Sequence, residues 1–302
     1  MKKINDACSS VDYVRNLDEL GENPVGNKKL WLRGFKSPLT LEQVLAINGK
    51  MWKRYMTTVY KYLTGTKDSY GKGIEPTPAY KKLIEDFDSI LDARDGEAWV
   101  DLCCGQGNVS KRLLSKVGAQ GTVHASDIMP DLPLSLKEDR RVKIKYFDVC
   151  MGFDCIQDSS VDGFASNMGF VYAIYFLYNG QKYMGKKAFQ LILAELFKKL
   201  KSGGRLIFSS PKKNTNFVKV FTASIRHMLN VAGWIKDGNI RPITGLRILL
   251  FALKIAYFGR IGMFHLYSEE EFMEMLSVIG FTNIQTKYSF AGQDLIIRAV
   301  KP

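Results

Sequence analysis

The sequence predicts an α/β fold in which helices cover both faces of a mainly parallel, doubly wound sheet. Three observations lead to this fold class. Strand-like and helix-like segments alternate from Leu83 onward, a turn with two glycines follows the first strand, and two strands near the end are joined by three residues. The chain has 302 residues, of which 46% are hydrophobic, so it can bury a sizeable core.

The elements of this core follow from their apolar patterns. Helices are expected where apolar residues recur at helical spacing, at 81–93, 108–117, 185–201 and 268–280. Seven strands are expected, at 98–103, 121–128, 142–149, 161–168, 205–211 and in the segments TNIQTKYSF and DLIIRAVK. The Ala-Gly-Gln connection between the last two is too short for a crossover, so the last strand runs antiparallel to its neighbour.

Two helix ends carry sequence signals. Ser268 and Glu271 have the spacing of a capping box, which predicts that the last helix begins there. Gly203 and Gly204 follow the helix at 185–201, and glycine can supply the left-handed cap that ends a helix.

Two segments lie outside the core, which takes 85–211 and 265–302. Residues 1–84 are expected to form an N-terminal helical cap, because 40–63 carries apolar residues at helical spacing and 65–80 is a loop rich in Gly and Pro. The second segment is a helical insertion before the last helix and hairpin.

The insertion, residues 212–264, is basic and amphipathic. It holds nine Lys or Arg residues and one acidic residue. Lys219 and Arg226 are seven apart, as are Arg247 and Lys254, so each helix has a cationic stripe beside a broad apolar face. The apolar runs are too short to span a bilayer, but such helices suit a membrane interface. A lid packed on the core and a nucleic-acid surface are the alternatives, and the interleaved aliphatic residues argue against nucleic acid.

Charge and cysteine usage limit the partners and the compartment. The net charge of +13 favours an anionic partner surface. The cysteines are Cys8, Cys103, Cys104, Cys150 and Cys155. Their odd number and the lack of a CxxC pair argue against a disulfide framework or a structural zinc site, and no metal is expected. The N-terminus lacks the apolar core of a secretory signal. A cytoplasmic location is therefore expected, with peripheral association at a membrane as an option.

A polar residue ends each of the first four strands. These residues are Asp101, Asp127, Asp148 and Asn167. Ligands of open parallel sheets bind beyond the carboxyl ends of the strands, so the four side chains predict a ligand rim. Gly105 and Gly107 let the backbone approach the ligand, and the following helix adds its N-terminal N–H groups. Asp127 follows Gly107 by 20 residues, a position from which a carboxylate can accept hydrogen bonds from both ribose hydroxyls.

The turn also carries a family resemblance. A nicotinamide-binding fold would need glycine at the position of Ser110. WVDLCCGQG instead resembles V-L-D-L-G-C-G-x-G, the first motif of the class I S-adenosylmethionine-dependent methyltransferases. DSSVDGFASN, LKKLKSGGRLIFSSP and GFTNIQTK are similar to later landmarks of that family. The resemblance covers 85–211 and 266–302, and it implies a Rossmann-like seven-stranded fold with S-adenosylmethionine as the cofactor.

The resemblance also implies a set of site residues. The cofactor would bind Asp101, Cys103, Gly105, Gly107, Asp127, Ile128, Asp148, Val149 and Asn167. Asp127 resembles the ribose acid, and Asp148 the acid near the adenine. Cys103 replaces the first glycine of the motif, beside the methionine end, whereas Cys104 is expected to pack as a small hydrophobe. Adjacent strand residues face opposite sides, so the two thiols cannot both meet one ligand.

The expected chemistry is methyl transfer, for which alignment of a nucleophile with the methyl group can suffice. Tyr172, after the fourth strand, and His265, before the last core helix, are the candidates for contact with the methyl acceptor. The basic amphipathic insertion favours a hydrophobic or amphiphilic acceptor of the lipid, quinone or isoprenoid type. The alternatives are an RNA or protein methyltransferase that uses the basic surface, and a membrane-associated scaffold with this fold but no catalysis.

Overall fold

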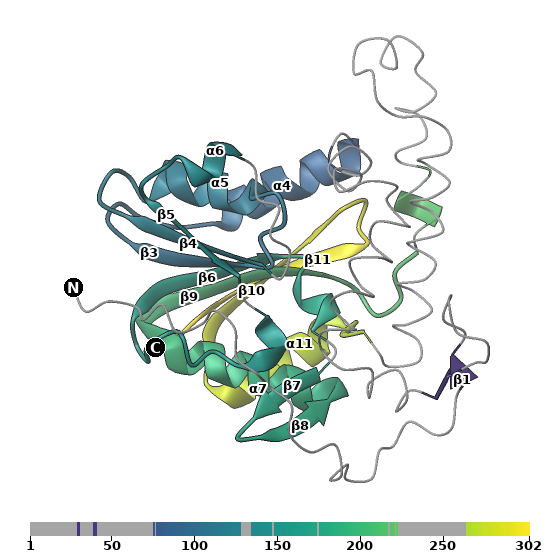
Figure 1. Ribbon diagram of the computed structural model, residues 1–302. Coiled ribbons are helices and arrows are strands. Elements are labelled where there is room, and N and C mark those ends of the chain that lie inside the picture. Colours follow the sequence, from purple (N-terminus) through teal and green to yellow (C-terminus); the bar gives the residue numbers. More distant parts are fainter. Residues whose placement is uncertain are drawn as a thin grey trace.

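A seven-stranded sheet runs through the middle of the computed structural model, with helices on both faces (Figure 1). The structure describes residues 75, 77–127, 134–146, 148–173, 175–216, 218–220, 222 and 264–302, and the backbone of 29–30 and 39–40. The strands are β3 (Ala98–Leu102), β4 (Thr122–Asp127), β5 (Val142–Tyr146), β6 (Val161–Asn167), β9 (Leu200–Pro211), β10 (Thr282–Ser289) and β11 (Asp294–Val300). Their spatial order is β10-β11-β9-β6-β3-β4-β5.

The direction of the strands agrees with the prediction. Strands β9, β6, β3, β4 and β5 are parallel, whereas β11 pairs antiparallel with both β9 and β10. The predicted seven-stranded sheet is therefore confirmed, and so is the antiparallel last strand that the short Ala-Gly-Gln connection indicated.

Helices α4 (Pro78–Ile90), α5 (Asn108–Lys116) and the short α6 (Leu134–Lys137) lie on one face of the sheet, and α7 (Gly185–Lys199) and α11 (Glu269–Ile279) on the other (Figure 1). Helix α11 begins with the predicted capping box. The backbone N–H of Glu271 donates to Ser268 Oγ at 3.3 Å, and the backbone N–H of Ser268 donates to Glu271 Oε2 at 2.8 Å. Helix α4 has Thr77 as its N-cap and a proline in its first turn, both favourable at a helix start.

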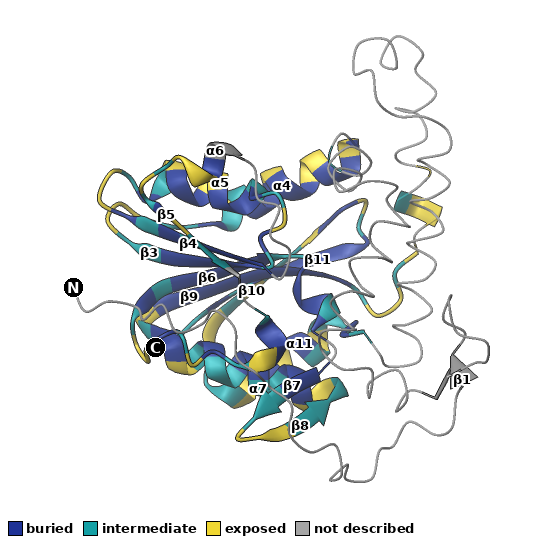
Figure 2. Ribbon diagram, in the orientation of Figure 1, coloured by how far each residue is buried: buried dark blue, intermediate teal, exposed yellow. Residues whose placement is uncertain are grey.

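The sheet separates two hydrophobic cores, so its central strands are buried on both faces (Figure 2). Trp99 of β3 faces α4 and α5, and its neighbour Val100 faces α7 and α11, because successive strand residues alternate. Trp99 also explains a glycine in the next strand. A Cβ atom on Gly163 would lie 2.4 Å from the indole ring, so only glycine lets the ring pack against β6.

The predicted glycine cap of the helix at 185–201 is wrong. Helix α7 ends at Lys199 with Leu200 in an extended conformation, and β9 begins there rather than at 205. The register between β6 and β9 shifts over this stretch, from Val161↔Leu200 to Gly163↔Arg205. Gly203 is left-handed, with φ of 75°, so it serves the irregular start of β9 instead of the helix end.

Two strand pairs were not predicted. An antiparallel hairpin, β7 (Tyr175–Tyr178) and β8 (Gln181–Met184), lies beside α7, where Phe176 is buried. A second pair, β1 (Lys29–Leu30) and β2 (Leu39–Thr40), lies in the segment that was expected to contain helices and loops. The rest of the expected N-terminal cap, up to residue 74, and most of the insertion at 212–264 lie outside the described residues. Within the described part, no helix is long and apolar enough to cross a membrane.

Candidate functional site

The four predicted polar strand ends meet at one edge of the sheet. Strands β6, β3, β4 and β5 are neighbours and parallel, so their carboxyl ends lie side by side. Asp127 and Asn167 are the last residues of β4 and β6, Asp101 is the penultimate residue of β3, and Asp148 follows β5 by two residues. The structure therefore brings the four side chains to the same rim.

The turn between β3 and α5 is built from left-handed residues. Cys103, Gly105 and Gly107 have φ of 57°, 52° and 74°. The backbone N–H of Gly105 donates to Asp127 Oδ2 at 2.8 Å, which ties the turn to the end of β4. A Cβ atom on Gly107 would lie 1.9 Å from Leu136 Cδ1, so this glycine is needed for packing. A Cβ atom on Gly105 would meet nothing within 4 Å, so open space adjoins the backbone there.

Asp101 is a buried carboxyl group with an unused oxygen. Ser110 Oγ donates to Asp101 Oδ2 at 2.6 Å, whereas Asp101 Oδ1 has no hydrogen-bond partner in the part of the chain that the structure describes. Burial raises the pKa of Asp101 to about 7; the hydrogen bonds from Ser110 oppose this shift and the charge of Asp127 adds to it. A cation at the rim would favour the ionised form of Asp101. The orphaned oxygen therefore fits a positively charged ligand.

Cys103 lies in the middle of this acidic cluster. Burial raises the pKa of its thiol well above the usual range, and the nearby carboxylates of Asp127, Asp148 and Asp101 raise it further. The thiol is therefore neutral at physiological pH, and it does not have the thiolate character of a nucleophile or metal ligand. The residue was expected at the end of the strand, but β3 ends at Leu102 and Cys103 adopts the left-handed conformation that favours glycine.

Cys103 and Cys104 contact different cores, as predicted. Cys104 packs with the residues under α4 and α5, whereas Cys103 packs against the core beside α7. Cys103 also meets Gly169, where a Cβ atom would lie 2.4 Å from Cys103 Cβ, 3.0 Å from its Sγ and 2.7 Å from Ser166 Oγ. The turn and the segment after β6 are therefore in close contact at this cysteine.

Asp148 has a local structural role in addition to its place at the rim. It is the N-cap of the 3₁₀ turn η2 (Val149–Met151), and its Oδ1 accepts a hydrogen bond from the Cys150 backbone N–H at 2.9 Å. Val149 is buried within that turn. Ile128, the remaining residue of the predicted cofactor set, lies outside the described residues.

A polar chain joins helix α4 to the rim, and the sequence reasoning missed it. Asn167 Nδ2 and Asn108 Nδ2 both donate to Tyr80 Oη, at 3.4 and 3.3 Å, and Asn108 also bonds to Glu75. Burial raises the pKa of Tyr80 to about 12, so the phenol stays neutral. No pattern in the sequence pointed to Tyr80, because residues 65–80 were expected to form a loop, whereas α4 begins at Pro78 and includes Tyr80.

The two candidates for the acceptor site differ in their surroundings. Tyr172 lies on the 3₁₀ turn η3 (Phe170–Tyr172), which two residues separate from the end of β6, and is partly exposed. Its ring packs edge-on against that of Phe264, with the ring centroids 5.7 Å apart. Burial raises the pKa of Tyr172, and the nearby Cys103 raises it further. Tyr172 therefore lies beside the turn as a neutral phenol.

His265 is part of the aromatic core. It is 1% exposed, its Nδ1 lies 3.1 Å from Tyr267 Oη, and its Nε2 bonds to the Ala173 carbonyl oxygen. Its ring centroid is 5.1 Å from that of Phe189, and burial lowers the pKa of His265 to about 4. The imidazole links two segments of the backbone, and this position does not favour contact with an acceptor.

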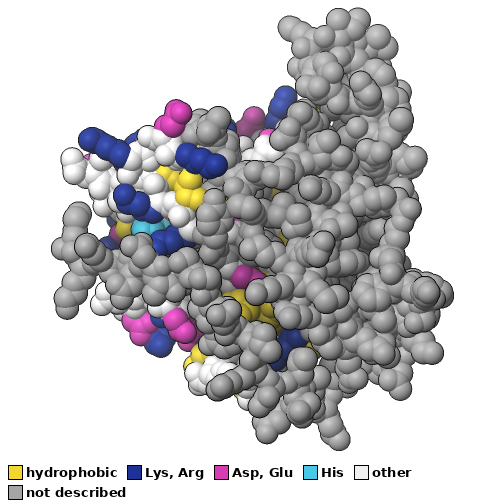
Figure 3. All heavy atoms as spheres, in the orientation of Figure 1, with side chains coloured by type: hydrophobic (Ala, Val, Ile, Leu, Met, Phe, Trp, Pro, Cys, Tyr) yellow, Lys and Arg dark blue, Asp and Glu magenta, His cyan; other side chains and the backbone are white. Residues whose placement is uncertain are grey.

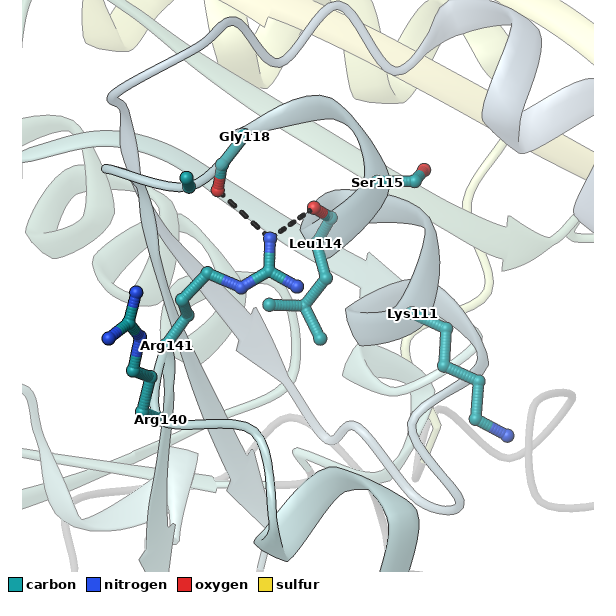
Figure 4. A pocket seen from close by; sticks show the side chains of 7 residues that line it. Lys111, Leu114, Ser115, Gly118, Arg140 and Arg141 are labelled. Atoms are coloured by element: carbon teal, nitrogen blue, oxygen red, sulfur yellow. Dashed lines mark hydrogen bonds between the residues drawn. The ribbon is translucent and has the colours of Figure 1, made fainter.

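A separate hollow of about 520 Å³ lies at the C-terminal end of α5, away from the rim. Figure 4 shows the Arg141 guanidinium pointing at the carbonyl oxygens of Leu114 and Gly118, at 3.1 and 2.9 Å, with Lys111 and Arg140 extending away from it. Arg141 also pairs with Asp139 at 2.6 Å. These bonds stabilise the end of the helix, where cations are favourable.

Basic side chains gather over the part of the molecule that contains α5, α6 and β5 (Figure 3). Lys143 and Lys145 project from β5, an edge strand of the sheet, and Lys143 lies opposite His124 of β4. Lysines on an edge strand discourage pairing with other strands, and here they also give this face a positive potential. In the part of the chain that the structure describes, no three His, Cys, Asp or Glu side chains are placed to hold a metal ion.

Comparisons with known proteins identify the family of the chain and proteins of similar fold. Residues 78–237 match the model of the ubiE/COQ5 methyltransferase family. A 1,6-didemethyltoxoflavin N1-methyltransferase of Burkholderia thailandensis, solved with its namesake compound and S-adenosylhomocysteine, is 16% identical over 88% of this chain and 93% of its own, with a TM-score of 0.51. A possible exported protein of Bordetella parapertussis is 14% identical, over 87% of this chain and 86% of its own, with a TM-score of 0.52. These two likenesses concern the fold, and no curated protein matches the chain.

Proposed function

Because the chain belongs to the ubiE/COQ5 methyltransferase family and is an S-adenosylmethionine-dependent enzyme, we propose that it methylates a hydrophobic or amphiphilic small molecule of the lipid, quinone or isoprenoid type. The observation that carries the proposal is the acidic rim beside the open backbone of Gly105, together with the partly exposed residue Tyr172, whose phenol lies near Cys103 of the same turn.

The residues present at the rim fit S-adenosylmethionine. In this proposal Asp127 binds the ribose hydroxyls, and Asp148 with Val149 lines the adenine. The methionine end lies along Asp101, Cys103 and Gly105, where a buried carboxyl oxygen is unused and the backbone is accessible. When bound, the cofactor supplies a methyl group on a positively charged sulfur.

The carboxylates around Cys103 give the site a preference for a cation. Asp101, Asp127 and Asp148 all act on the same thiol, so their negative potentials add at one place. A positively charged cofactor is favoured there over its neutral, demethylated product. We therefore expect the three carboxylates to help both the binding of the cofactor and the release of the product.

The acceptor would lie over η3 and the segment before α11. Tyr172 and Phe264 form an edge-on aromatic pair there, and Met168 packs beside the end of β6. Aromatic and thioether side chains bind apolar rings and chains. In this proposal the N-terminal segment 1–84 and the basic segment 212–264 cover the bound acceptor, and the basic segment contacts an anionic membrane.

The competing assignment is an RNA or protein methyltransferase, which the basic surface over α5, α6 and β5 favours. Incubation of the enzyme with S-adenosylmethionine labelled in its methyl group, together with total lipid, total RNA or total protein, separates the two. We expect the label in the solvent-extractable fraction of the lipid reaction. Label that stays with RNA or protein would contradict the proposed acceptor class.

A matched variant and a binding experiment complete the test. Asp127→Ala should strongly reduce the labelling at a low concentration of S-adenosylmethionine, because it removes the carboxylate from the end of β4 and weakens cofactor binding. Flotation with vesicles containing anionic lipid tests the membrane contact. A protein that ignores such vesicles but binds RNA with a steep salt dependence would favour the alternative.

A further inference from the structure

Asp294 is a buried acid at the same rim, two strands away from Asn167. It is the first residue of β11, and it pairs in register with Pro211 at the end of β9. Because β11 is antiparallel to its neighbours, its first residue lies at the carboxyl ends of the parallel strands. Asp294 is 0% exposed, and among the described residues neither of its carboxyl oxygens has a partner with the geometry of a hydrogen bond.

The neighbouring polar groups cannot satisfy an ionised Asp294. Ser209 of β9, which pairs in register with Ile296, is near enough to act on Asp294, but its hydroxyl hydrogen is used, since Ser209 Oγ donates to Asn167 Oδ1 at 2.7 Å. The same oxygen accepts from the Met168 backbone N–H at 3.0 Å. Burial raises the pKa of Asp294 to about 8, and the nearby Ser209 and the Leu295 backbone N–H only partly oppose the shift. The carboxyl group therefore carries a proton at neutral pH.

A buried carboxyl group without partners lowers the stability of a protein. An apolar residue of similar shape would be neutral or stabilising at such a place. Ile296, two residues further along β11 on the same face, belongs to the core under α4 and α5, so an apolar residue at 294 would have apolar neighbours. The acid at 294 is therefore better explained by a ligand than by the fold.

We propose that Asp294 donates a hydrogen bond from its protonated carboxyl group to an oxygen of the methyl acceptor, and that it thereby positions the acceptor beside Ser209 and Asn167. This inference rests on the proposed function, because it places the acceptor over the same rim. It specifies the acceptor further: a molecule with a carbonyl, ether or hydroxyl oxygen close to the atom that is methylated. Sites that hydrogen-bond such a group reject analogues that lack it, because the buried partner is then left unpaired.

Two variants separate this role from a structural one. Asp294→Asn is close in shape and keeps a hydrogen-bond donor, whereas Asp294→Leu removes the donor. The matched control is Asp86→Asn, since Asp86 is also buried but is satisfied by Ser289 Oγ at 2.7 Å and Lys82 Nζ at 2.8 Å. We expect Asp86→Asn to lower the melting temperature and Asp294→Leu to leave it unchanged or raise it.

The binding test uses 1-tetralone and tetralin, which share a bicyclic skeleton and differ by one carbonyl oxygen. Binding of each compound is measured by calorimetry on the full chain saturated with S-adenosylhomocysteine. We expect the wild type and Asp294→Asn to bind 1-tetralone about tenfold more tightly than tetralin, because one hydrogen bond contributes about that much affinity. Asp294→Leu should lose that preference and bind S-adenosylhomocysteine as the wild type does.

The inference would be overturned if the wild type bound 1-tetralone no more tightly than tetralin, or if Asp294→Leu kept the preference for 1-tetralone. It would also be overturned if Asp294→Leu lowered the melting temperature as much as Asp86→Asn does. Failure of the proposed function is distinguishable, since it would appear as absent S-adenosylhomocysteine binding by the wild type or as methyl label outside the lipid fraction. A second readout is the KM for the labelled lipid acceptor, which Asp294→Leu should raise about tenfold with an unchanged KM for S-adenosylmethionine.

Discussion

The contact between Cys103 and Gly169 makes a quantitative prediction about the turn. Gly169 has φ of −83° and ψ of −41°, so alanine fits its backbone conformation and only the added Cβ atom matters. That atom would lie 2.4 Å from Cys103 Cβ and 3.0 Å from its Sγ. Gly169→Ala should therefore be destabilising in the presence of Cys103, and Cys103→Gly should relieve the clash.

The expected changes in the free energy of unfolding follow from the contacts of the added Cβ atom and from the left-handed backbone of Cys103. Overpacking of this kind costs about 1–3 kcal/mol. Cys103→Gly removes about 1–2 kcal/mol of left-handed strain, offset by about 0.5–1 kcal/mol of backbone entropy and by the lost packing of the side chain. The single Cys103→Gly change should thus alter the free energy of unfolding by less than about 1 kcal/mol. In the double variant, the remaining contact is with Ser166 Oγ, and no hydrogen bond to another described residue holds that hydroxyl group in place.

Urea denaturation of the wild type, both single variants and the double variant gives the interaction energy between the two positions. We expect about 1–2 kcal/mol, with the double variant more stable than Gly169→Ala alone. Cys104→Ala combined with Gly169→Ala is the matched control, since Cys104 packs in the other core and should be additive. An interaction energy below about 0.3 kcal/mol for Cys103 and Gly169 would refute the proposed packing. A loss of cofactor binding in Cys103→Gly would show that the thiol has a role beyond packing.

Two further predictions concern the core. Gly163→Ala would place a Cβ atom 2.4 Å from the Trp99 ring, so it should lower the free energy of unfolding by about 1–3 kcal/mol. Urea denaturation measures this loss, and an unchanged free energy of unfolding would contradict the close approach of β6 to the indole. Burial gives His265 a folded-state pKa of about 4, below its value near 6.5 in the unfolded chain. Between these two pH values the unfolded state binds more protons than the folded state, so the free energy of unfolding should fall as the pH is lowered from 6.5 to 4. In His265→Phe the free energy of unfolding should depend less steeply on pH over this range, and an equal pH dependence in both proteins would contradict the buried neutral imidazole. Part of the pH dependence remains in the variant, because the pKa of His124 is also lowered to about 4.

The sequence predicted best those features that depend on local patterns. The capping box of Ser268 and Glu271 involves only four consecutive residues, and the antiparallel last strand followed from the length of one connection. The rim was predictable because the ends of neighbouring parallel strands must lie together. Asp127 and Asn167 are indeed terminal residues of their strands.

Features that depend on tertiary contacts could not be predicted in this way. Tyr80 reaches Asn108 and Asn167 only because α4 packs across the sheet, and no spacing in the sequence encodes that contact. His265 was expected near the substrate from its place before the last helix, but its bond to the Ala173 carbonyl oxygen holds it in the core. The left-handed conformation of Cys103 likewise comes from the turn, since cysteine itself does not favour it.

The central claim is that the polar strand ends bind S-adenosylmethionine through the carboxylate of Asp127. Calorimetric titration of the wild type and of Asp127→Ala with S-adenosylmethionine tests this most directly. We expect saturable binding at one site per chain by the wild type. Asp127→Ala should bind about 10- to 100-fold more weakly, as expected for the loss of hydrogen bonds to a charged group. Equal affinity of the two proteins, or no binding by the wild type, would contradict the account.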